Sequence, residues 1–407
     1  MKSTKYLLIG RGLAAGQAVK GIRKEDSDGG IILINQEPYL PYNRPPLSKG
    51  LLRGEQSRED VFVESREFYD EQDVERILGV IVGALDLDAK EATLSSGEVI
   101  AFEKALLATG GSPIRLEIPG DDLPEVHTLR TVDDSLAIRK AAEGHERAVI
   151  IGAGFIGMEL AASLTELGLD VTVIEMRPQL WPRFTDEALA GFFQDYFTER
   201  GITFHLDETV EEIQGTAHVE GVQTASGEVI PADFVCIAVG IRPNVGLARA
   251  AGLDVDDGVI VNQYLQTSHP DVYAVGDIAN YPDPYFDKRR RVEHWGQADY
   301  TGALAGRNMA GARQPYDLLT YVWSELFDLH LEFAGDESEA DEMLQRGKFE
   351  DTSFTRFFLK DGRMTAFFAI NPESGVLGEW NRLIKERVDL SKREDALTDP
   401  DFDPADL

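Results

Sequence analysis

The chain has only one cysteine, Cys236, among 407 residues. A single cysteine excludes an intramolecular disulfide and argues against a thiolate metal site, so we expect no bound metal. The sequence has no run of about 18 uncharged apolar residues and therefore predicts no membrane-spanning helix. Its first residues lead into an apolar strand without the cleavage site of a secretory signal, so we expect a cytoplasmic protein.

Basic residues are also scarce, with 40 Lys and Arg against 72 Asp and Glu and a formal net charge of −32. Nucleic acids and anionic membranes attract positive surfaces, so this charge argues against both as partners. The acidic residues are spread along the whole chain. Such a surface keeps a protein hydrated in a salt-rich cytoplasm or simply keeps it soluble, and composition does not decide between the two.

The clearest motif lies between residues 148 and 175. An apolar strand leads into Gly152, Gly154 and Gly157, which precede a helical pattern and a second strand ending at Glu175. The first glycine permits a tight turn, the second lets a pyrophosphate approach the backbone, and the third allows close packing of helix and strand. An acid about 20 residues after the turn suits a ribose 2′-hydroxyl. This segment therefore predicts a dinucleotide-binding unit.

A second turn of the same kind follows the strand at residues 6–9. Gly10 and Gly12 hold the glycine positions, and Ala15 is the small helix residue. The acid that would bind the ribose is displaced here. After the strand at residues 31–34, either Glu37 or the neutral Gln36 fills that role.

Six further segments resemble one enzyme family in sequence and in order. The first is proline-stiffened and fixes Arg44 and Lys49. The segments are residues 40–49, 108–110, 233–244, 276–277, 291–298 and 320–327. They are similar to flavoprotein pyridine-nucleotide oxidoreductases, in the branch of ferredoxin, rubredoxin and putidaredoxin reductases and apoptosis-inducing factor. The resemblance covers residues 5–330 and, more loosely, the rest; Thr301 and Tyr321 depart from the usual pattern.

The resemblance implies an α/β fold with two Rossmann-like dinucleotide-binding domains and a small α+β C-terminal domain. Residues 1–113 and 240–315 are expected to form the FAD-binding domain and residues 114–239 the NAD-binding domain. The C-terminal domain is expected to span residues 316–407, with strands at residues 354–359 and 364–370 and a helix near 380–388. Its acidic, proline-broken end, residues 395–407, is expected to be mobile.

The resemblance also assigns cofactor-binding residues, with FAD on the first turn and Asp277 and NAD on the second turn. The complete set is Gly10, Gly12, Ala15, Glu37, Arg44, Lys49, Val82, Ala108, Thr109, Gly110, Asp277, Glu293, His294, Trp295, Ala298, Trp323, Gly152, Gly154, Phe155, Ile156, Gly157, Glu159, Glu175 and Gly240. A purely structural role for His294 remains open. Glu175 should favour NADH over NADPH, although Arg177 is able to pair with a 2′-phosphate.

Lys49 and Glu159 are the residues that the resemblance assigns to catalysis. Lys49 would lie near flavin N5 and Glu159 at the nicotinamide amide, with the two forming an ion pair, and Phe155 would stack or gate over the nicotinamide. Such a pair stabilises negative charge as it develops. Without the resemblance, Glu159 is a solvated helix residue.

Thiol chemistry is excluded because residues 44–49 lack the cysteines of related disulfide reductases, and Cys236 lies in an apolar strand that predicts a buried, inert thiol. The remaining functions are an NADH-dependent reductase for an iron-sulfur or rubredoxin-type protein and, as the alternative, a redox sensor like apoptosis-inducing factor. The sensor would show slow oxidase activity and NADH-linked dimerisation. The sequence identifies neither the acceptor nor the oligomeric state, and a homodimer stays open.

The densest basic run, residues 288–291, immediately precedes the segment expected at the flavin edge. A local positive patch is able to steer an acidic carrier despite the net charge, because screening confines such interactions to about 8 Å. The alternative is that these side chains pair with neighbouring carboxylates.

Overall fold

The computed structural model describes residues 2–182 and 184–407. The chain divides into two compact units, each assembled from separate stretches of sequence. Unit 1 comprises Met1–Pro45, Arg58–Ser112 and Ile241–Thr320, and unit 2 comprises Pro46–Ser57, Pro113–Gly240 and Tyr321–Leu407. The regions predicted as the NAD-binding and C-terminal domains thus share unit 2.

Unit 1 is built on a seven-stranded sheet in the order β3-β2-β1-β6-β5-β4, with β19 also paired to β6. Its strands are β1 (Lys2–Gly10), β2 (Ile31–Asn35), β3 (Val74–Leu78), β4 (Val82–Asp86), β5 (Glu91–Leu94), β6 (Val99–Ala108) and β19 (Val272–Ala274). The strands β1, β2, β3, β6 and β19 are parallel, and β4 and β5 are antiparallel. Every residue of β2 is buried, as expected for a parallel strand covered on both faces.

The remaining elements of unit 1 are short apart from two helices. They are α1 (Leu13–Glu25), η2 (Glu59–Val61), α3 (Arg66–Glu71), β7 (Gly111–Pro113), β16 (Ile241–Pro243), α7 (Gly246–Ala250), β17 (Val255–Asp256), β18 (Gly258–Ile260), η3 (Gly276–Ile278), β20 (Ala279–Pro282), β21 (Arg289–Arg290) and α8 (Trp295–Met309). The strands β17, β18, β20 and β21 form a four-stranded sheet, and β7 pairs with β16.

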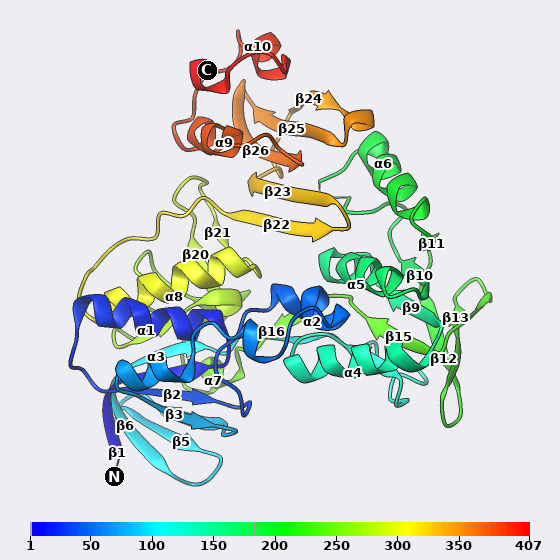
Figure 1. Ribbon diagram of the computed structural model, residues 1–407. Coiled ribbons are helices and arrows are strands. Elements are labelled where there is room, and N and C mark those ends of the chain that lie inside the picture. Colours follow the sequence, from blue (N-terminus) through cyan, green and yellow to red (C-terminus); the bar gives the residue numbers. More distant parts are fainter. Residues whose placement is uncertain (1, 183) are drawn as a thin grey trace. The chain divides into compact units, whose positions relative to one another are not determined.

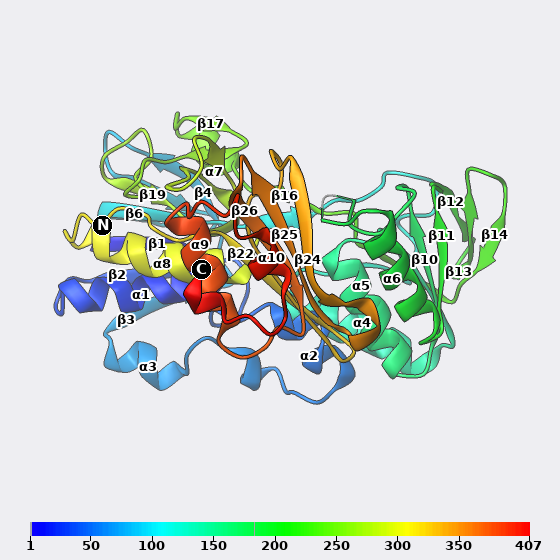
Figure 2. The same ribbon diagram turned by 90° about the horizontal axis from the view of Figure 1, so that it is seen from above.

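Helices α1 and α8 lie side by side, as the blue and yellow helices of Figures 1 and 2 show. Glycines set their spacing, because a Cβ added at any of three positions would overlap a carbonyl oxygen of the other helix. The overlaps are Gly21 with Ala303 at 2.2 Å, Gly302 with Ala14 at 2.3 Å and Gly306 with Ala18 at 2.3 Å. The two helices therefore meet backbone to backbone, and side-chain size does not set their separation.

Unit 2 contains a five-stranded parallel sheet in the order β11-β10-β9-β15-β8, and a three-stranded antiparallel sheet is inserted in sequence between β11 and β15. The strands are β8 (Val126–Thr128), β9 (Arg147–Ile151), β10 (Asp170–Glu175), β11 (Ile202–Leu206), β12 (Val210–Gly215), β13 (Val219–Thr224), β14 (Val229–Pro231) and β15 (Phe234–Ile237). The helices here are η1 (Pro45–Ser48), α2 (Gly50–Arg53), α4 (Val132–Gly144), α5 (Phe155–Glu166) and α6 (Glu187–Thr198). Cys236 is fully buried in β15, as predicted.

The rest of unit 2 is a five-stranded antiparallel sheet in the order β22-β23-β26-β25-β24, followed by short helices. These elements are β22 (Tyr321–Leu326), β23 (Leu329–Gly335), β24 (Glu342–Lys348), η4 (Phe349–Asp351), β25 (Ser353–Lys360), β26 (Arg363–Ile370), α9 (Val376–Lys385), α10 (Glu394–Thr398) and η5 (Pro404–Asp406). The indole of Trp380 on α9 packs edge-on against Phe357 of β25, 4.8 Å between ring centres, so α9 covers one face of the sheet (Figure 1).

The prediction of a mobile C-terminal tail is wrong. Leu397 and Leu407 are buried. Arg393 donates to the carbonyl oxygen of Leu407 at 2.8 Å, and Arg346 donates to the carbonyl oxygens of Pro400 and Phe402 at 2.9 Å each. Two arginines thus hold an acidic segment that composition alone marks as disordered.

Across residues 2–182 and 184–407, no helix combines the length and the apolar character needed to cross a membrane.

Candidate functional site

The second glycine turn joins β9 to α5, and its three glycines differ in what they permit. Gly152 has φ +103°, a conformation that side chains rarely adopt, and a Cβ at Gly157 would lie 2.0 Å from the carbonyl oxygen of Gly152. At Gly154 an added Cβ would meet nothing within 4 Å. The fold requires the first and third glycines, whereas the second leaves open space of the kind that a diphosphate needs.

Glu175 ends β10 beside this turn. Its Oε2 accepts a hydrogen bond from the amide of Ala153 at 2.7 Å, and its Oε1 accepts one from the amide of Arg177 at 2.9 Å. Each carboxylate oxygen is able to accept a second hydrogen bond, so a ribose hydroxyl remains compatible with this geometry. Ile156 is 45% exposed and Met176 is 61% exposed. The ribose role of Glu175 stays a prediction.

The first glycine turn is closed by its own side chains. Glu37 is only 8% exposed, its Oε1 lies 2.8 Å from Nη1 of Arg11, and its Oε2 accepts a hydrogen bond from the hydroxyl of Tyr42 at 2.7 Å. Burial raises the pKa of Tyr42, so its hydroxyl stays protonated as a donor. Gln36 is exposed. Of the two candidates for the ribose, Glu37 is the one whose side chain reaches the turn.

The proline-stiffened segment runs alongside the first turn, with a backbone bridge between Gly12 and Tyr42. A Cβ at Gly12 would lie 2.6 Å from Nη1 of Arg44, whose guanidinium lies 5.6 Å from the centre of the Tyr42 ring. The indole N–H of Trp295 donates to Oδ1 of Asn43 at 2.9 Å. A guanidinium held against a glycine turn suits a phosphate.

The starts of η3, α1 and α8 converge in unit 1. A Cβ at Gly276 would lie 3.5 Å from the Cβ of Ala14 and 3.7 Å from that of Ala298. The amide of Gly276 donates to the hydroxyl of Thr301 at 3.0 Å. Thr301, a departure from the family pattern, therefore anchors the turn that presents Asp277. The flavin contact of the half-buried Asp277 remains a prediction.

The helix starts at both glycine turns are suited to phosphate. Gly12 and Gly154 are the N-caps of α1 and α5, and among the residues that the structure describes no side chain caps either helix. Their first amides are thus available to an anion at the positive end of the helix dipole. In contrast, Nδ1 of His294 caps α8 by accepting from the amide of Gly296 at 3.3 Å, so His294 has at least a structural role.

Thr109 and Gly110 are tied to the exit segment of the second nucleotide unit. The hydroxyl of Thr109 donates to the carbonyl oxygen of Asn244 at 2.7 Å, and the side-chain amide of Asn244 donates to the carbonyl oxygen of Thr109 at 3.0 Å. The amide of Asn244 also donates to the carbonyl oxygen of Gly110 at 2.8 Å. Asn244, to which the sequence analysis assigned no role, therefore fixes this turn.

The other predicted cofactor residues lie in varied surroundings. Val82, Ala108 and Ala15 are buried, and Ala108 lies against Gly10, where a Cβ would come 2.4 Å from its carbonyl oxygen. Glu293 is exposed and pairs with Arg291. Gly240 belongs to unit 2, and its carbonyl oxygen accepts from the amide of Ile114 at 3.0 Å.

The predicted ion pair between Lys49 and Glu159 is confirmed. Nζ of Lys49 lies 2.8 Å from Oε1 of Glu159, which is 6% exposed and so is not the solvated helix residue of the alternative interpretation. The hydroxyl of Ser324 donates to the same oxygen at 2.6 Å, and that of Ser48 donates to Oε2. Nζ of Lys49 also lies 5.2 Å from the centre of the Trp323 ring. Neither serine was predicted as a site residue, although Ser48 lies in the proline-stiffened segment and Ser324 in the family-like segment at residues 320–327.

Aromatic side chains back Phe155 at the start of α5. Its ring stacks on Trp181 with 5.4 Å between ring centres and an angle of 23°. Trp181 packs edge-on against Phe193 of α6 at 4.7 Å. Phe155, which is predicted to lie beside the nicotinamide, therefore packs against the apolar core of unit 2.

The basic run before α8 is paired within unit 1. Arg289 donates to Oδ1 of Asn280 at 3.0 Å and to backbone carbonyls. Arg290 lies 3.4 Å from Asp283, and Arg291 lies 2.7 Å from Asp257. Arg290 and Arg291 thus pair with carboxylates, as in the alternative interpretation, whereas the partners of Arg289 are uncharged. The basic docking patch stays a prediction.

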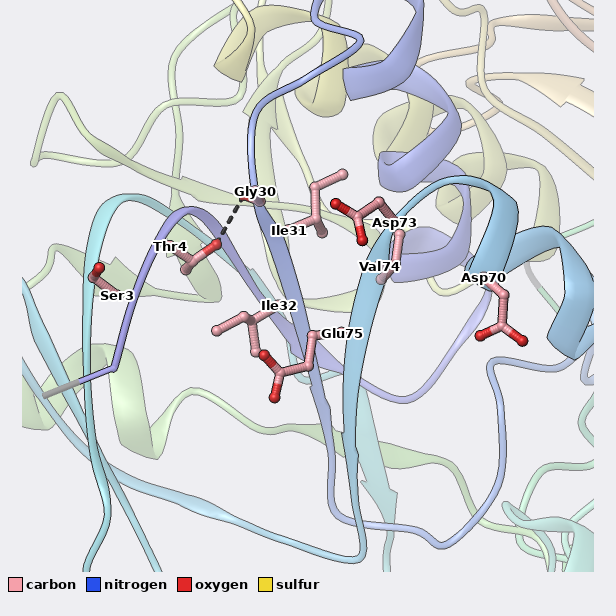
Figure 3. Close-up of a pocket in the computed structure, with 9 residues that line it drawn as sticks. All are labelled: Ser3, Thr4, Gly30, Ile31, Ile32, Asp70, Asp73, Val74 and Glu75. Atoms are coloured by element: carbon pink, nitrogen blue, oxygen red, sulfur yellow. Dashed lines mark hydrogen bonds between the residues drawn. The ribbon is translucent and has the colours of Figure 1, made fainter.

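A cavity of about 330 Å³ lies in unit 1 (Figure 3), at the end of the sheet opposite the first glycine turn. Its lining consists of Ser3, Thr4, Gly30, Ile31, Ile32, Asp70, Asp73, Val74 and Glu75, and the hydroxyl of Thr4 donates to the carbonyl oxygen of Gly30 at 2.8 Å. Nucleotides bind at the carboxyl ends of parallel strands, where Gly10 lies, and not at the amino ends that line this cavity.

Known proteins with the same arrangement were found by sequence and by structure. The family model described as pyridine nucleotide-disulphide oxidoreductase matches residues 4–302, and the one described as reductase C-terminal matches residues 321–407. Rhodocoxin reductase from Rhodococcus erythropolis is 32% identical over 97% of this chain and 93% of its own length.

Solved structures also resemble the whole chain. A crystal structure of a ferredoxin reductase from Rhodopseudomonas palustris has a TM-score of 0.93 and 32% identity and covers 99% of both chains. A chain in the crystal structure of the covalent putidaredoxin reductase–putidaredoxin complex has a TM-score of 0.90 and 28% identity, covering 96% of this chain and 94% of that one.

Proposed function

The chain belongs to the pyridine nucleotide-disulphide oxidoreductase family, and from this premise we propose that it is an NADH-dependent flavoprotein reductase that passes electrons to a small iron-sulfur or rubredoxin-type protein. Its cofactors are FAD and NAD(H). The proposal includes a cytoplasmic location, where NADH is available.

One observation carries the proposal. The chain contains two glycine turns, at Gly10 and Gly152, and each leads into a helix whose first amides have no side-chain cap within the described part of the chain. Two phosphate-binding turns in one chain fit two dinucleotides. When bound, these cofactors would supply hydride transfer from the nicotinamide to the flavin and onward electron transfer to the acceptor.

The residues of this chain supply binding and charge. Arg44 and the start of α1 would hold the FAD diphosphate, and Glu37 would hold its adenosine ribose. Gly154 and the start of α5 would receive the NADH diphosphate, with Glu175 on the ribose. Lys49 supplies a positive charge in a largely buried setting, where electrostatic stabilisation is stronger than in water. Glu159 balances that charge and keeps the ammonium in place.

Relatives support the choice of acceptor. The similar sequence is named as a reductase for rhodocoxin, and one similar structure contains a reductase linked to putidaredoxin. In contrast, Cys236 has no cysteine partner, and burial raises its pKa to about 12, so the thiol stays protonated and is unsuited to a dithiol mechanism.

Rapid mixing of the purified yellow protein with NADH in the absence of oxygen tests whether NADH reduces the flavin. The flavin absorbance should fall as the reduction proceeds. Ferredoxins and rubredoxins are then added in turn, and at least one should reoxidise the flavin much faster than oxygen does. A slow oxygen reaction, no response to any carrier and NADH-linked dimerisation would instead favour the redox-sensor function.

A further inference from the structure

The Glu159 carboxylate is held by three side-chain donors from different parts of unit 2. Lys49 and Ser324 contact Oε1 at 2.8 and 2.6 Å, and Ser48 donates to Oε2. Glu159 itself comes from α5, one turn after the glycine turn. We propose that Ser48 and Ser324 are positioning residues that hold this carboxylate in the orientation in which it pairs with Lys49, an inference that rests on the proposed function.

The chemistry of a buried carboxylate explains why hydroxyls are needed. An ionised carboxylate only accepts hydrogen bonds, and leaving one of its oxygens without a donor in a dry site is unfavourable. Lys49 contacts Oε1 alone. The hydroxyl of Ser48 satisfies the other oxygen, so donors on both oxygens fix the rotation of the group. Hydroxyl-to-carboxylate bonds are charge-assisted and stronger than neutral ones.

Both serines sit beside a residue that contacts Lys49 or is Lys49 itself. Ser48 immediately precedes Lys49 in sequence. Ser324 follows Trp323, whose ring centre lies 5.2 Å from Nζ of Lys49. The neighbours Trp323 and Ser324 of β22 therefore contact both members of the ion pair: Trp323 contacts Lys49, and Ser324 contacts Glu159. Ser48 contacts Glu159 and is joined directly to Lys49 in the chain.

The backbones that carry the serines are themselves fixed. The hydroxyl of Ser163, one turn further along α5 than Glu159, donates to the carbonyl oxygen of Ser48 at 2.6 Å. Ser324 is paired across the sheet with Leu331 of β23, and its side chain is 1% exposed. Supporting hydrogen bonds of this kind hold a site residue within the small tolerance that catalysis needs.

The test is the limiting rate of flavin reduction by NADH in Ser48→Ala and Ser324→Ala. Each variant should lower that rate about tenfold, equivalent to about 1.4 kcal/mol, and leave the NADH dissociation constant nearly unchanged. In a Glu159→Gln background, the same serine variants should change the rate by less than about twofold, because the carboxylate that they position is gone.

Ser135→Ala is the matched control. Ser135 is equally buried, and its hydroxyl donates to the carbonyl oxygen of Leu47 at 2.7 Å without contacting Glu159. It should leave the limiting rate unchanged. FAD content and the thermal unfolding midpoint identify a variant that fails to fold. Because the two serines lie on separate elements, the inference can still be tested with one variant if the other does not fold.

Two results would overturn the inference: unchanged rates in both folded serine variants, or equal losses with and without Glu159. If NADH does not reduce the flavin of the unmodified protein, the proposed function itself is wrong. The two failures are therefore distinguishable.

Discussion

The two glycine turns share a spacing but differ in how much of the turn the protein itself covers. At the first turn Gly12 is buried beneath the Arg44 guanidinium, and Glu37 is enclosed by Arg11 and Tyr42. At the second turn Gly154 is exposed, with open space around it, and Ile156 is exposed beside it.

If FAD binds at the first turn and NAD(H) at the second, as proposed, this difference matches the different demands on the two cofactors. A flavin that stays bound through many cycles benefits from a covered site, whereas a nicotinamide nucleotide must enter and leave in every cycle. Pre-formed contacts between protein side chains reduce the ordering that binding requires and favour retention. The comparison predicts that substitutions at the first turn affect folding and flavin content, and that those at the second affect nucleotide exchange.

The largest effect is expected from Gly10→Ala at the first turn. The new Cβ would lie 2.4 Å from the carbonyl oxygen of Ala108, an overlap with backbone that must displace β1 or β6. Overpacking usually destabilises a protein by up to about 3 kcal/mol, and we expect this variant to lose about that much free energy of unfolding. Chemical denaturation should report that loss, and the flavin-to-protein absorbance ratio should fall. The control is Gly83→Ala, where the nearest atom is 3.7 Å away; equal stability of the two variants would contradict the prediction.

The second prediction concerns nucleotide choice at Glu175. The protein should favour NADH over NADPH because a carboxylate repels a 2′-phosphate, and Glu175→Ala should narrow the ratio of kcat/KM values by about 10- to 100-fold, or 1.4 to 2.7 kcal/mol. The variant also loses an acceptor for the Ala153 amide, so NADH binding should weaken. Steady-state kinetics with both nucleotides measure the change. Similar kcat/KM values in the unmodified protein would show that Arg177 offsets the carboxylate.

Gly154→Ala should have an intermediate effect confined to binding. The added methyl group meets no protein atom within 4 Å, so the free energy of unfolding should change by less than about 0.5 kcal/mol. A diphosphate lying against the backbone would meet that methyl group, and the NADH dissociation constant should rise about tenfold, or 1.4 kcal/mol. Binding titration and chemical denaturation separate the two quantities. A stability loss as large as that of Gly10→Ala would remove the contrast between the turns.

The smallest effect is expected at Cys236, which pairs with Ile150 of β9 behind the second turn. Since burial raises the pKa of its thiol to about 12, alkylation by iodoacetamide should be negligible at pH 8 and should appear only when the protein unfolds. Cys236→Ala should leave the rate of flavin reduction unchanged. Loss of reduction in a folded variant would return a thiol to the mechanism.

Local spacing predicted the parts of this molecule that depend on local geometry. Gly152 and Gly157 are readable from sequence because a positive φ and a 2.0 Å overlap each demand glycine. The apolar strands were located correctly, although their ends differ: the strand expected at residues 354–359 is Ser353–Lys360. The helix expected near residues 380–388 is Val376–Lys385.

Contacts between distant residues were not predictable in the same way. Ser48 and Ser324 reach Glu159 across 111 and 165 residues of sequence, and neither has a local pattern that marks a carboxylate as its partner. The ordered tail depends on Arg346 and Arg393, whose carbonyl partners composition cannot reveal. The Lys49–Glu159 pair came from family resemblance and was confirmed by structure.

The glycine contacts between α1 and α8 limit how this protein is able to change over evolutionary time. Where side chains separate two helices, a larger residue on one side is readily compensated by a smaller one on the other. Here Gly21, Gly302 and Gly306 each face a backbone carbonyl, which no substitution can shrink. These positions should therefore tolerate almost no variation, while the solvent-facing residues of the same helices drift freely. The first glycine turn is subject to the same constraint because α1 begins directly after it.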